Sequence, residues 1–157
     1  MFALTTGQFT PTSPAGFKGR STPAGTPEEP FNPILLMLAS GATFVARCFA
    51  GDLEHMKYVF KRALLHKGFA FIDVLQPCVS FYNLFEFYQK HVYKLELKNH
   101  DPSDWFKALE VAKEWNYEGE DSVRIPIGIF YETRKSTYEE NVVRGKKIQE
   151  GAPSIEE

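Results

Sequence analysis

The sequence has 157 residues, a net charge of -2 and 43% hydrophobic residues. This length is sufficient for one hydrophobic core, or for one domain with an appendage. The nearly balanced charge argues against a nucleic-acid-binding protein. With two cysteines, no signal-peptide pattern and no apolar run long enough to cross a membrane, the sequence predicts a cytoplasmic protein without a disulfide framework.

The chain opens with a long segment, residues 5–32, that is dense in Pro, Gly, Ser and Thr. Such a segment buries too little apolar surface to form a core, so it is expected to be a functional loop or disordered. Asn32 and Pro33 then predict the N-cap and first turn of a short apolar helix over residues 34–39, which ends at Gly41.

A strand, a helix and a second strand are expected next. Residues 42–49 predict a buried strand, and Asp52 begins a helix that Gly68 closes. Residues 69–75 are almost continuously apolar, which is typical of a strand buried on both faces. This order predicts two parallel strands joined by a right-handed crossover in an α/β fold. The helix should bury one face, which carries Leu53, Met56, Val59, Phe60, Ala63 and Leu64.

Pro77 ends the second strand and leaves Cys78 at its carboxyl end, where open α/β sheets bind ligands. Taken alone, a single cysteine beside a strand is more often a small buried hydrophobic residue than a ligand. Cys48 lies inside the first strand and is assigned to core packing.

Aromatic residues dominate the chain after Cys78. Residues 81–93 are interpreted as core or subunit interface, because a base-stacking surface would need basic residues beside them. The segment Asp101-Pro102-Ser103-Asp104 predicts the cap of a helix, residues 124–131 predict a strand, and the charged residues 136–157 are expected to fray. One side of the predicted helix carries Trp105, Ala108, Leu109, Ala112 and Trp115.

The remaining polar residues give weaker signals. The four histidines show no metal-ligand spacing, and His55 and His66 are expected on the surface of their helix. Asp73, inside an apolar strand, is expected to have a structural hydrogen-bonding partner, with a place beside a cofactor cleft as the alternative. Arg47 is expected to form an ion pair, with a CoA or substrate contact as the alternative.

Four segments together resemble a known family: LTTGQFTPTSPAG at 4–16, GATFVAR at 41–47, HKGFAFIDVLQPC at 66–78 and IPIGIFYE at 125–132. Their order and spacing are similar to those of the β subunits of 2-oxoacid:ferredoxin oxidoreductases, the thiamine-diphosphate enzymes of the pyruvate and 2-oxoglutarate synthase type. The resemblance implies an α/β fold, namely the C-terminal half of a doubly wound thiamine-diphosphate-binding sheet (residues 1–78). An aromatic-rich extension (79–145) and a charged tail (146–157) would follow.

The resemblance also assigns site residues. Cys78 matches the last of four thiolates that hold a [4Fe-4S] cluster, and thiolates are the ligands such a cluster needs. Met1 falls where a backbone carbonyl completes the Mg²⁺ shell. Leu4, Thr5 and Thr6 would line the thiamine diphosphate and substrate pocket, where hydroxyl and amide groups suit a diphosphate or carboxylate. Without the other motifs, LTTGQ would be interpreted as an ordinary polar turn.

Several family features have no counterpart in this sequence: the Gly-Asp-Gly segment that binds Mg²⁺, a second Mg²⁺-ligating Asn and the first three cluster cysteines. The chain is therefore expected to be the C-terminal half of a β subunit, begun at an internal methionine or left by a split or truncated gene. No catalytic side chain is assigned to it.

The implied reaction is the oxidative decarboxylation of a 2-oxoacid to an acyl-CoA, with electrons passing to ferredoxin. The implied partners are the α subunit and the missing N-terminal half of the β subunit, and the isolated chain is expected to be inactive. Two alternatives stay open. One is a non-catalytic fragment that only binds a subunit, and the other is a thiol-dependent enzyme that uses Cys78, which would need a lowered thiol pKa and a nearby histidine.

Overall fold

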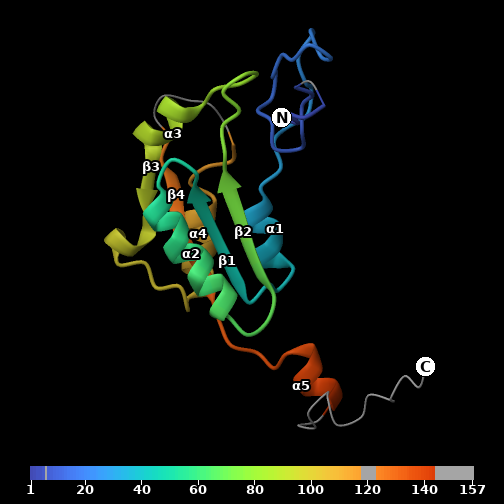
Figure 1. The fold of residues 1–157 in the computed structure, drawn as a ribbon. Helices are drawn as coiled ribbons and strands as arrows, with labels where there is room; N and C mark the ends of the chain where they lie inside the picture. The colour runs from blue at the N-terminus through green and yellow to red at the C-terminus, as the bar shows by residue number, and fades with distance from the viewer. Residues whose placement is uncertain (6, 118–122, 144–157) are drawn as a thin grey trace, which may run out of the picture.

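The computed structural model describes residues 1–5, 7–117 and 123–143 (Figure 1). The predicted tail 146–157 and Thr6 lie outside the described residues. The elements in chain order are α1 (Pro33–Ala39), β1 (Phe44–Phe49), α2 (Leu53–Leu65), β2 (Ala70–Leu75), α3 (Phe85–His91), β3 (Val92–Lys94), the 3-10 helix η1 (Leu95–Lys98), α4 (Trp105–Ala112), β4 (Ile125–Glu132) and α5 (Tyr138–Val143).

The four strands form one mixed sheet in the order β2-β1-β4-β3. β1 and β2 are parallel, in the register that pairs Phe44 with Ala70 and Phe49 with Leu75. β4 runs antiparallel to β1, with an irregularity between Val45 and Ala46, and β3 is parallel to β4. The predicted parallel pair is confirmed, and the chain has a mixed α/β sheet.

Helices cover both faces of this sheet (Figure 1). On one face, alternate residues of β1, among them Phe44 and Cys48, pack with Val59 of α2. On the other face, Val45 packs with residues of α1, η1, α4 and β4. β1 is buried along its whole length. The assignment of Cys48 to core packing is therefore confirmed, since its exposure is 0%.

Side-chain caps fix where three helices begin. The Asn32 side chain accepts from the Leu35 N–H, and the Asp52 side chain accepts from the His55 N–H. Asp104 accepts from the first-turn N–H groups of α4. Each bond satisfies a backbone donor that the helix itself leaves free, which is why short polar residues predict helix starts.

The structure corrects the prediction that residues 69–75 form a strand buried on both faces. β2 lies at the edge of the sheet, and Phe69, just before it, is 59% exposed. β4 occupies the other side of β1, so β1 and β4 are the inner strands and β2 has no neighbour on its outer side among the described residues. An apolar run alone does not say which strand is central.

The buried face of α2 agrees with the prediction only in part: Val59 is buried, and Met56 and Ala63 pack against the same cluster. Leu53, Phe60 and Leu64 are largely exposed, whereas His55 is buried together with Val59. The surface positions expected for His55 and His66 are therefore wrong. The His66 side chain is only 2% exposed, and its Nε2 lies 2.9 Å from the Thr43 hydroxyl oxygen. A helix turns 100° per residue, so position 55 shares the face of position 59, four residues later.

The two ends of the sheet face different surroundings. The N-terminal segment lies beyond the carboxyl ends of β1 and β2, whereas α5 lies at the opposite end (Figure 1). None of the helices in the described part of the chain is long and apolar enough to cross a membrane. The carboxyl ends of the parallel strands are thus the place to look for a ligand site.

Candidate functional site

A tight turn follows β2 at the carboxyl end of the sheet. β2 ends at Leu75, Gln76 and Pro77 extend the chain, and the Tyr82 N–H donates to the Cys78 carbonyl oxygen at 3.0 Å. Cys78 and Tyr82 form an antiparallel bridge. We call residues 78–82 the cysteine turn.

The cysteine turn favours the thiolate form of Cys78. Backbone N–H groups of Phe81 and then Ser80 donate to the sulfur and lower the pKa of the Cys78 thiol. The other cysteine behaves in the opposite way, since burial raises the pKa of Cys48 to about 11. Because a thiolate is both the metal ligand and the nucleophile, Cys78 is prepared for such a role and Cys48 is not.

A cavity lies beside the cysteine turn, and three separate segments line it. Its volume is about 160 Å³, which is below the roughly 300–1,000 Å³ of typical small-molecule pockets. The cavity is therefore too small to hold a typical small-molecule ligand by itself. We call it the cysteine cavity. Its lining residues are Met1, Thr12, Asp73–Cys78, Tyr82, Leu84, Tyr88 and Tyr117.

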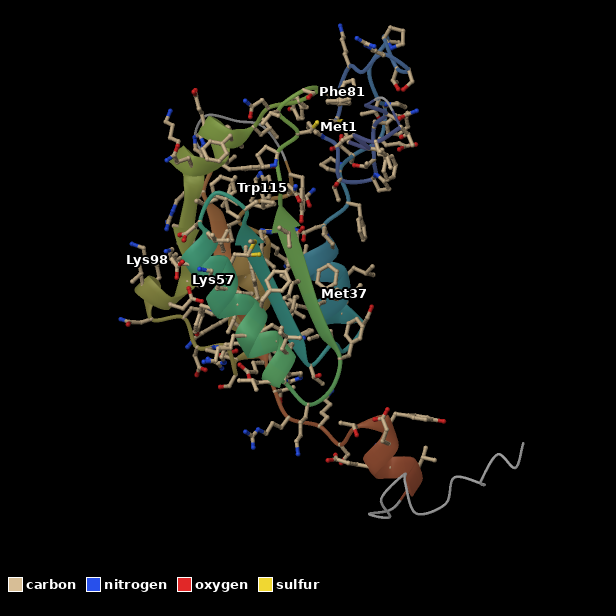
Figure 2. All side chains as sticks on the ribbon, in the orientation of Figure 1. Met1, Met37, Lys57, Phe81, Lys98 and Trp115 are labelled. Atoms are coloured by element: carbon tan, nitrogen blue, oxygen red, sulfur yellow. The ribbon has the colours of Figure 1, made fainter. Side chains whose placement is uncertain are left out.

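The N-terminal segment packs directly on the cysteine turn. The rings of Phe17 and Tyr82 meet edge to face at 5.0 Å, and the Arg20 guanidinium lies 5.9 Å from the Phe81 ring centre. Gly7 has a φ of +85°, and a Cβ there would lie 3.2 Å from Phe81. Figure 2 shows Met1 and Phe81 at the same end of the molecule. The Pro- and Gly-rich segment is thus ordered against the turn.

The predicted site residues of the N-terminal segment are placed differently from one another. Met1 lines the cysteine cavity together with Cys78. Leu4 is 99% exposed, and Thr5 is exposed with its hydroxyl 2.6 Å from the Gln8 side-chain oxygen. Thr6 lies outside the described residues. The role of Met1 toward Mg²⁺ and the roles of Leu4, Thr5 and Thr6 toward thiamine diphosphate and substrate stay predictions.

A buried ion pair supports the wall of the cysteine cavity. Arg47 Nε donates to Asp73 Oδ2 at 2.8 Å, and Arg47 also donates to the Tyr117 hydroxyl oxygen at 3.0 Å. The Tyr117 hydroxyl in turn donates to Asp73 Oδ2. The rings of Trp115, Tyr117 and Phe130 surround the guanidinium at 5.1 to 5.4 Å. Arg47 therefore has the structural ion pair that the sequence favoured, and Asp73 both pairs with it and borders the cavity.

The tyrosines of the cavity are protonated donors at neutral pH. Burial raises the pKa of Tyr88 to about 12, and burial likewise raises the pKa of Tyr82 and of Tyr117. Sequence reasoning did not find these residues or Thr12. The nearness of Tyr82 to Cys78 in the sequence is a signal, but Tyr117 is 39 residues further along and has none.

The donor groups at the cysteine cavity fit an iron–sulfur cluster better than Mg²⁺. Cys78 is partly exposed and its sulfur accepts from backbone N–H groups, which suits one ligand of an iron–sulfur cluster. The carboxylate at this wall, Asp73, is already engaged by Arg47, so the wall does not fit Mg²⁺. Among the described residues no group of three His, Cys, Asp or Glu side chains could hold a metal ion. No histidine borders the cavity in that part of the chain either.

A larger cavity of about 570 Å³ lies at the opposite end of the sheet. Its lining is of mixed charge, with Lys67, Arg134 and Lys135 beside Glu132 and Glu140. It contains none of the predicted site residues. Volume alone therefore does not mark the site.

Two family models match consecutive parts of the chain. Residues 1–74 match the thiamine pyrophosphate enzyme C-terminal TPP-binding domain. Residues 78–147 match the C-terminal family of the pyruvate ferredoxin oxidoreductase β subunit. β1 and β2 come from the first part and β3 and β4 from the second, so the two parts share one sheet.

Curated relatives and a solved structure resemble the chain over nearly its whole length. The β subunit of 2-oxoacid:ferredoxin oxidoreductase 1 from Aeropyrum pernix is 40% identical over 92% of this chain and 48% of its own length. The corresponding subunit from Saccharolobus solfataricus is 40% identical over 90% of this chain and 49% of its own length. The chain spans about half the length of the curated relatives it matches.

The match to a solved structure also covers nearly the whole of this chain and about half of the other chain. A 2-oxoglutarate:ferredoxin oxidoreductase from Magnetococcus marinus, whose structure contains 2-oxoglutarate, coenzyme A and succinyl-CoA, matches with a TM-score of 0.84 and 32% identity. The match covers 99% of this chain and 52% of that one.

Proposed function

Since the chain corresponds in sequence and fold to the C-terminal part of 2-oxoacid:ferredoxin oxidoreductase β subunits, we propose that it supplies this part of an enzyme that oxidatively decarboxylates a 2-oxoacid. The product is an acyl-CoA, and ferredoxin accepts the electrons. Thiamine diphosphate, when bound, supplies the chemistry that releases carbon dioxide from the 2-oxoacid. This chain contributes residues that position the ligands and stabilise their charges.

The observation that carries the proposal is the cysteine turn. Cys78 lies at the carboxyl end of a parallel strand and accepts hydrogen bonds from backbone N–H groups. Such hydrogen bonds stabilise a thiolate ligand and influence the reduction potential of an iron–sulfur cluster. In the proposed enzyme Cys78 is one of four cluster ligands, and the other three come from outside this chain.

The N-terminal segment is the proposed cofactor-facing part. Met1 borders the same cavity as Cys78, which would bring a diphosphate site and a cluster site close together. Leu4, Thr5 and Thr6 are proposed to line the thiamine diphosphate and 2-oxoacid pocket. Mg²⁺ prefers carboxylate oxygens, and the carboxylate at this wall, Asp73, is engaged by Arg47, so we assign no Mg²⁺-binding side chain to the chain.

The proposed partners follow from the same assignment. They are an α subunit, the N-terminal half of the β subunit, ferredoxin and CoA, and we propose a cytoplasmic location. One feature supports the N-terminal half as a direct contact. β2 has an unpaired outer edge in the described part of the chain, and Phe69 and Leu64 lie exposed near that edge and on the adjacent helix. Exposed strand edges pair readily with other chains.

A second candidate function is a non-catalytic, subunit-binding module. The exposed edge of β2 favours it equally well, because binding a partner needs no cofactor. The thiol-dependent enzyme has less support. The pKa of Cys78 is lowered, but no histidine lines the cysteine cavity among the described residues.

Completing the subunit tests the proposed function. The chain is co-produced with the N-terminal half of a β subunit and reconstituted with iron and sulfide, and the cluster is measured by visible absorption and electron paramagnetic resonance. Cys78→Ser should weaken or abolish the cluster signal. Cys48→Ser is the matched control and should leave the signal intact. A full cluster signal in Cys78→Ser would contradict the assignment, and a chain that binds the N-terminal half without assembling a cluster would favour the binding module.

A further inference from the structure

Because β2 lies at the edge of the sheet, the cysteine turn that follows it depends on side-chain contacts for its position. In the part of the chain that the structure describes, backbone pairing holds β2 only on the β1 side, up to the Phe49–Leu75 pair. Beyond Leu75, residues 76 and 77 lie outside the sheet ladder. An edge strand with one ladder opens more easily than an inner strand. The position of Cys78 must therefore be fixed by groups other than the sheet.

Asp73 is the residue of β2 that side chains from other elements contact. Its side chain is 16% exposed and borders the cysteine cavity. Two donors from elsewhere converge on its Oδ2 atom: Arg47 Nε from β1 and the Tyr117 hydroxyl from the segment after α4. Arg47 belongs to the inner strand β1, whereas Tyr117 belongs to the C-terminal extension. Tyr117 thus connects the extension to the strand that carries the cysteine.

Tyr117 is held firmly enough to act as such a support. Its ring stacks on Trp115 with 4.4 Å between the centres, and it is 8% exposed (Figure 2 labels Trp115). Its backbone has a φ of +63°, a conformation that bulky residues rarely adopt. Strained backbone of this kind persists where surrounding contacts enforce it, and it is frequent at functional sites. Here the enforced conformation aims the hydroxyl at Asp73.

We propose that Tyr117 is a positioning residue that fixes the cysteine turn through its hydrogen bond to Asp73. The inference rests on the proposed function, because the turn matters for catalysis only if Cys78 is a ligand. It goes beyond that function by giving the C-terminal extension a defined task at the cysteine cavity. The extension would then control how rigidly Cys78 is presented.

The test uses the chain as it stands and two matched controls. Tyr117→Phe removes the hydroxyl and keeps the ring that stacks on Trp115. Tyr93→Phe removes an equivalent tyrosine–carboxylate bond, since the Tyr93 hydroxyl donates to Glu114 at 2.7 Å away from the cavity. Tyr88→Phe alters a cavity-lining tyrosine with no such bond to Asp73 among the described residues. Each variant loses one hydroxyl, and in Tyr117→Phe the lost group had also accepted a hydrogen bond from Arg47.

Two measurements report on the turn. Amide hydrogen exchange should become about tenfold faster over residues 73–78 in Tyr117→Phe and stay within about twofold in both controls, because a hydrogen bond to a charged group is lost there. The protein labelled with ¹³C at cysteine gives signals from Cys48 and Cys78. The Cys78 signal should shift or broaden only in Tyr117→Phe, which a general loss of stability would not cause.

Each contrary result has a definite meaning. Unchanged exchange over residues 73–78 and an unmoved Cys78 signal in Tyr117→Phe would overturn the proposal. Equal changes in Tyr93→Phe would overturn it too, since they would indicate general destabilisation. Exposure of the buried Cys48 to a thiol reagent in Tyr117→Phe would show that Tyr117 supports the whole core instead. None of these readouts needs a cluster, so failure of the proposed function in the completed subunit would be recognised separately.

Discussion

Removing Asp73 should destabilise the chain more than removing Arg47, although the two residues form one ion pair. The Arg47 side chain is 0% exposed, whereas the Asp73 side chain is 16% exposed at the edge of the cysteine cavity. Asp73→Asn therefore leaves a positive charge in a dry core with no counter-charge. Arg47→Met leaves a carboxylate that reaches water and still accepts from Tyr117. The cost of an unpaired charge grows with its burial.

The magnitude follows from this asymmetry. Breaking a buried ion pair by removing one partner costs about 3–5 kcal/mol. Three aromatic rings keep their contacts with the guanidinium in Asp73→Asn. Such contacts are worth roughly 0.5–2 kcal/mol, so we expect a cost near the lower end, about 3 kcal/mol. For Arg47→Met we expect about 1–2 kcal/mol, because methionine refills most of the volume and the remaining carboxylate is partly exposed and still accepts from Tyr117.

Urea unfolding followed by circular dichroism measures these costs. We expect the midpoint to fall more in Asp73→Asn than in Arg47→Met. The double variant should lose about 1–3 kcal/mol less than the sum of the two single losses, because the residues share one hydrogen-bond network. The reasoning is refuted if Arg47→Met is the more costly change, or if the two losses simply add.

Two further predictions concern titrating groups. At mildly alkaline pH a thiol reagent should label Cys78 and leave Cys48 unlabelled. The reason is that N–H donors lower the pKa of Cys78, whereas burial raises the pKa of Cys48 to about 11. Peptide mass spectrometry measures the labelling, and equal labelling of the two cysteines would contradict the prediction. Asp52→Ala should cost about 1 kcal/mol by removing the cap of α2. A hydrogen bond from Lys94 lowers the pKa of Asp52, so its contribution is present above the ordinary value of 3.8 and is lost as the pH falls through the lower native value. The unfolding free energies of the variant and the natural chain should therefore converge in acid, and a gap that stays constant would count against this.

Local signals in the sequence were sufficient to predict most individual elements. Asn32, Asp52 and Asp104 each combine a short polar side chain with a following apolar pattern, and each caps a helix in the structure. The strands near 42–49 and 124–131 were found because their apolar residues are continuous. The burial of His55 was also within reach, since it lies four residues before Val59 on the same helix face. Attention to residue polarity instead of helix periodicity produced that error.

The arrangement of the strands had no comparable signal. β4 lies about 80 residues after β1, yet it occupies the position next to β1 and displaces β2 to the edge. Pairing over such a distance depends on packing of the whole chain, which no local pattern records. The apolar sequence of β2 is nevertheless informative. Its apolar residues are typical of a covered strand, yet it lies at the edge of the sheet in the described part of the chain.

The site shows the same division between local and distant information. Cys78 was found because a proline ends an apolar strand just before it, and that signal is local. The groups that give the cysteine its surroundings come from three distant parts of the chain: the N-terminal segment with Met1 and Thr12, the strand with Asp73, and Tyr117. Their convergence requires the crossover from β1 to β2 and the return of the chain after α4. A sequence can therefore identify the reactive side chain while leaving its supporting residues unassigned, and the Tyr117→Phe comparison examines one of these.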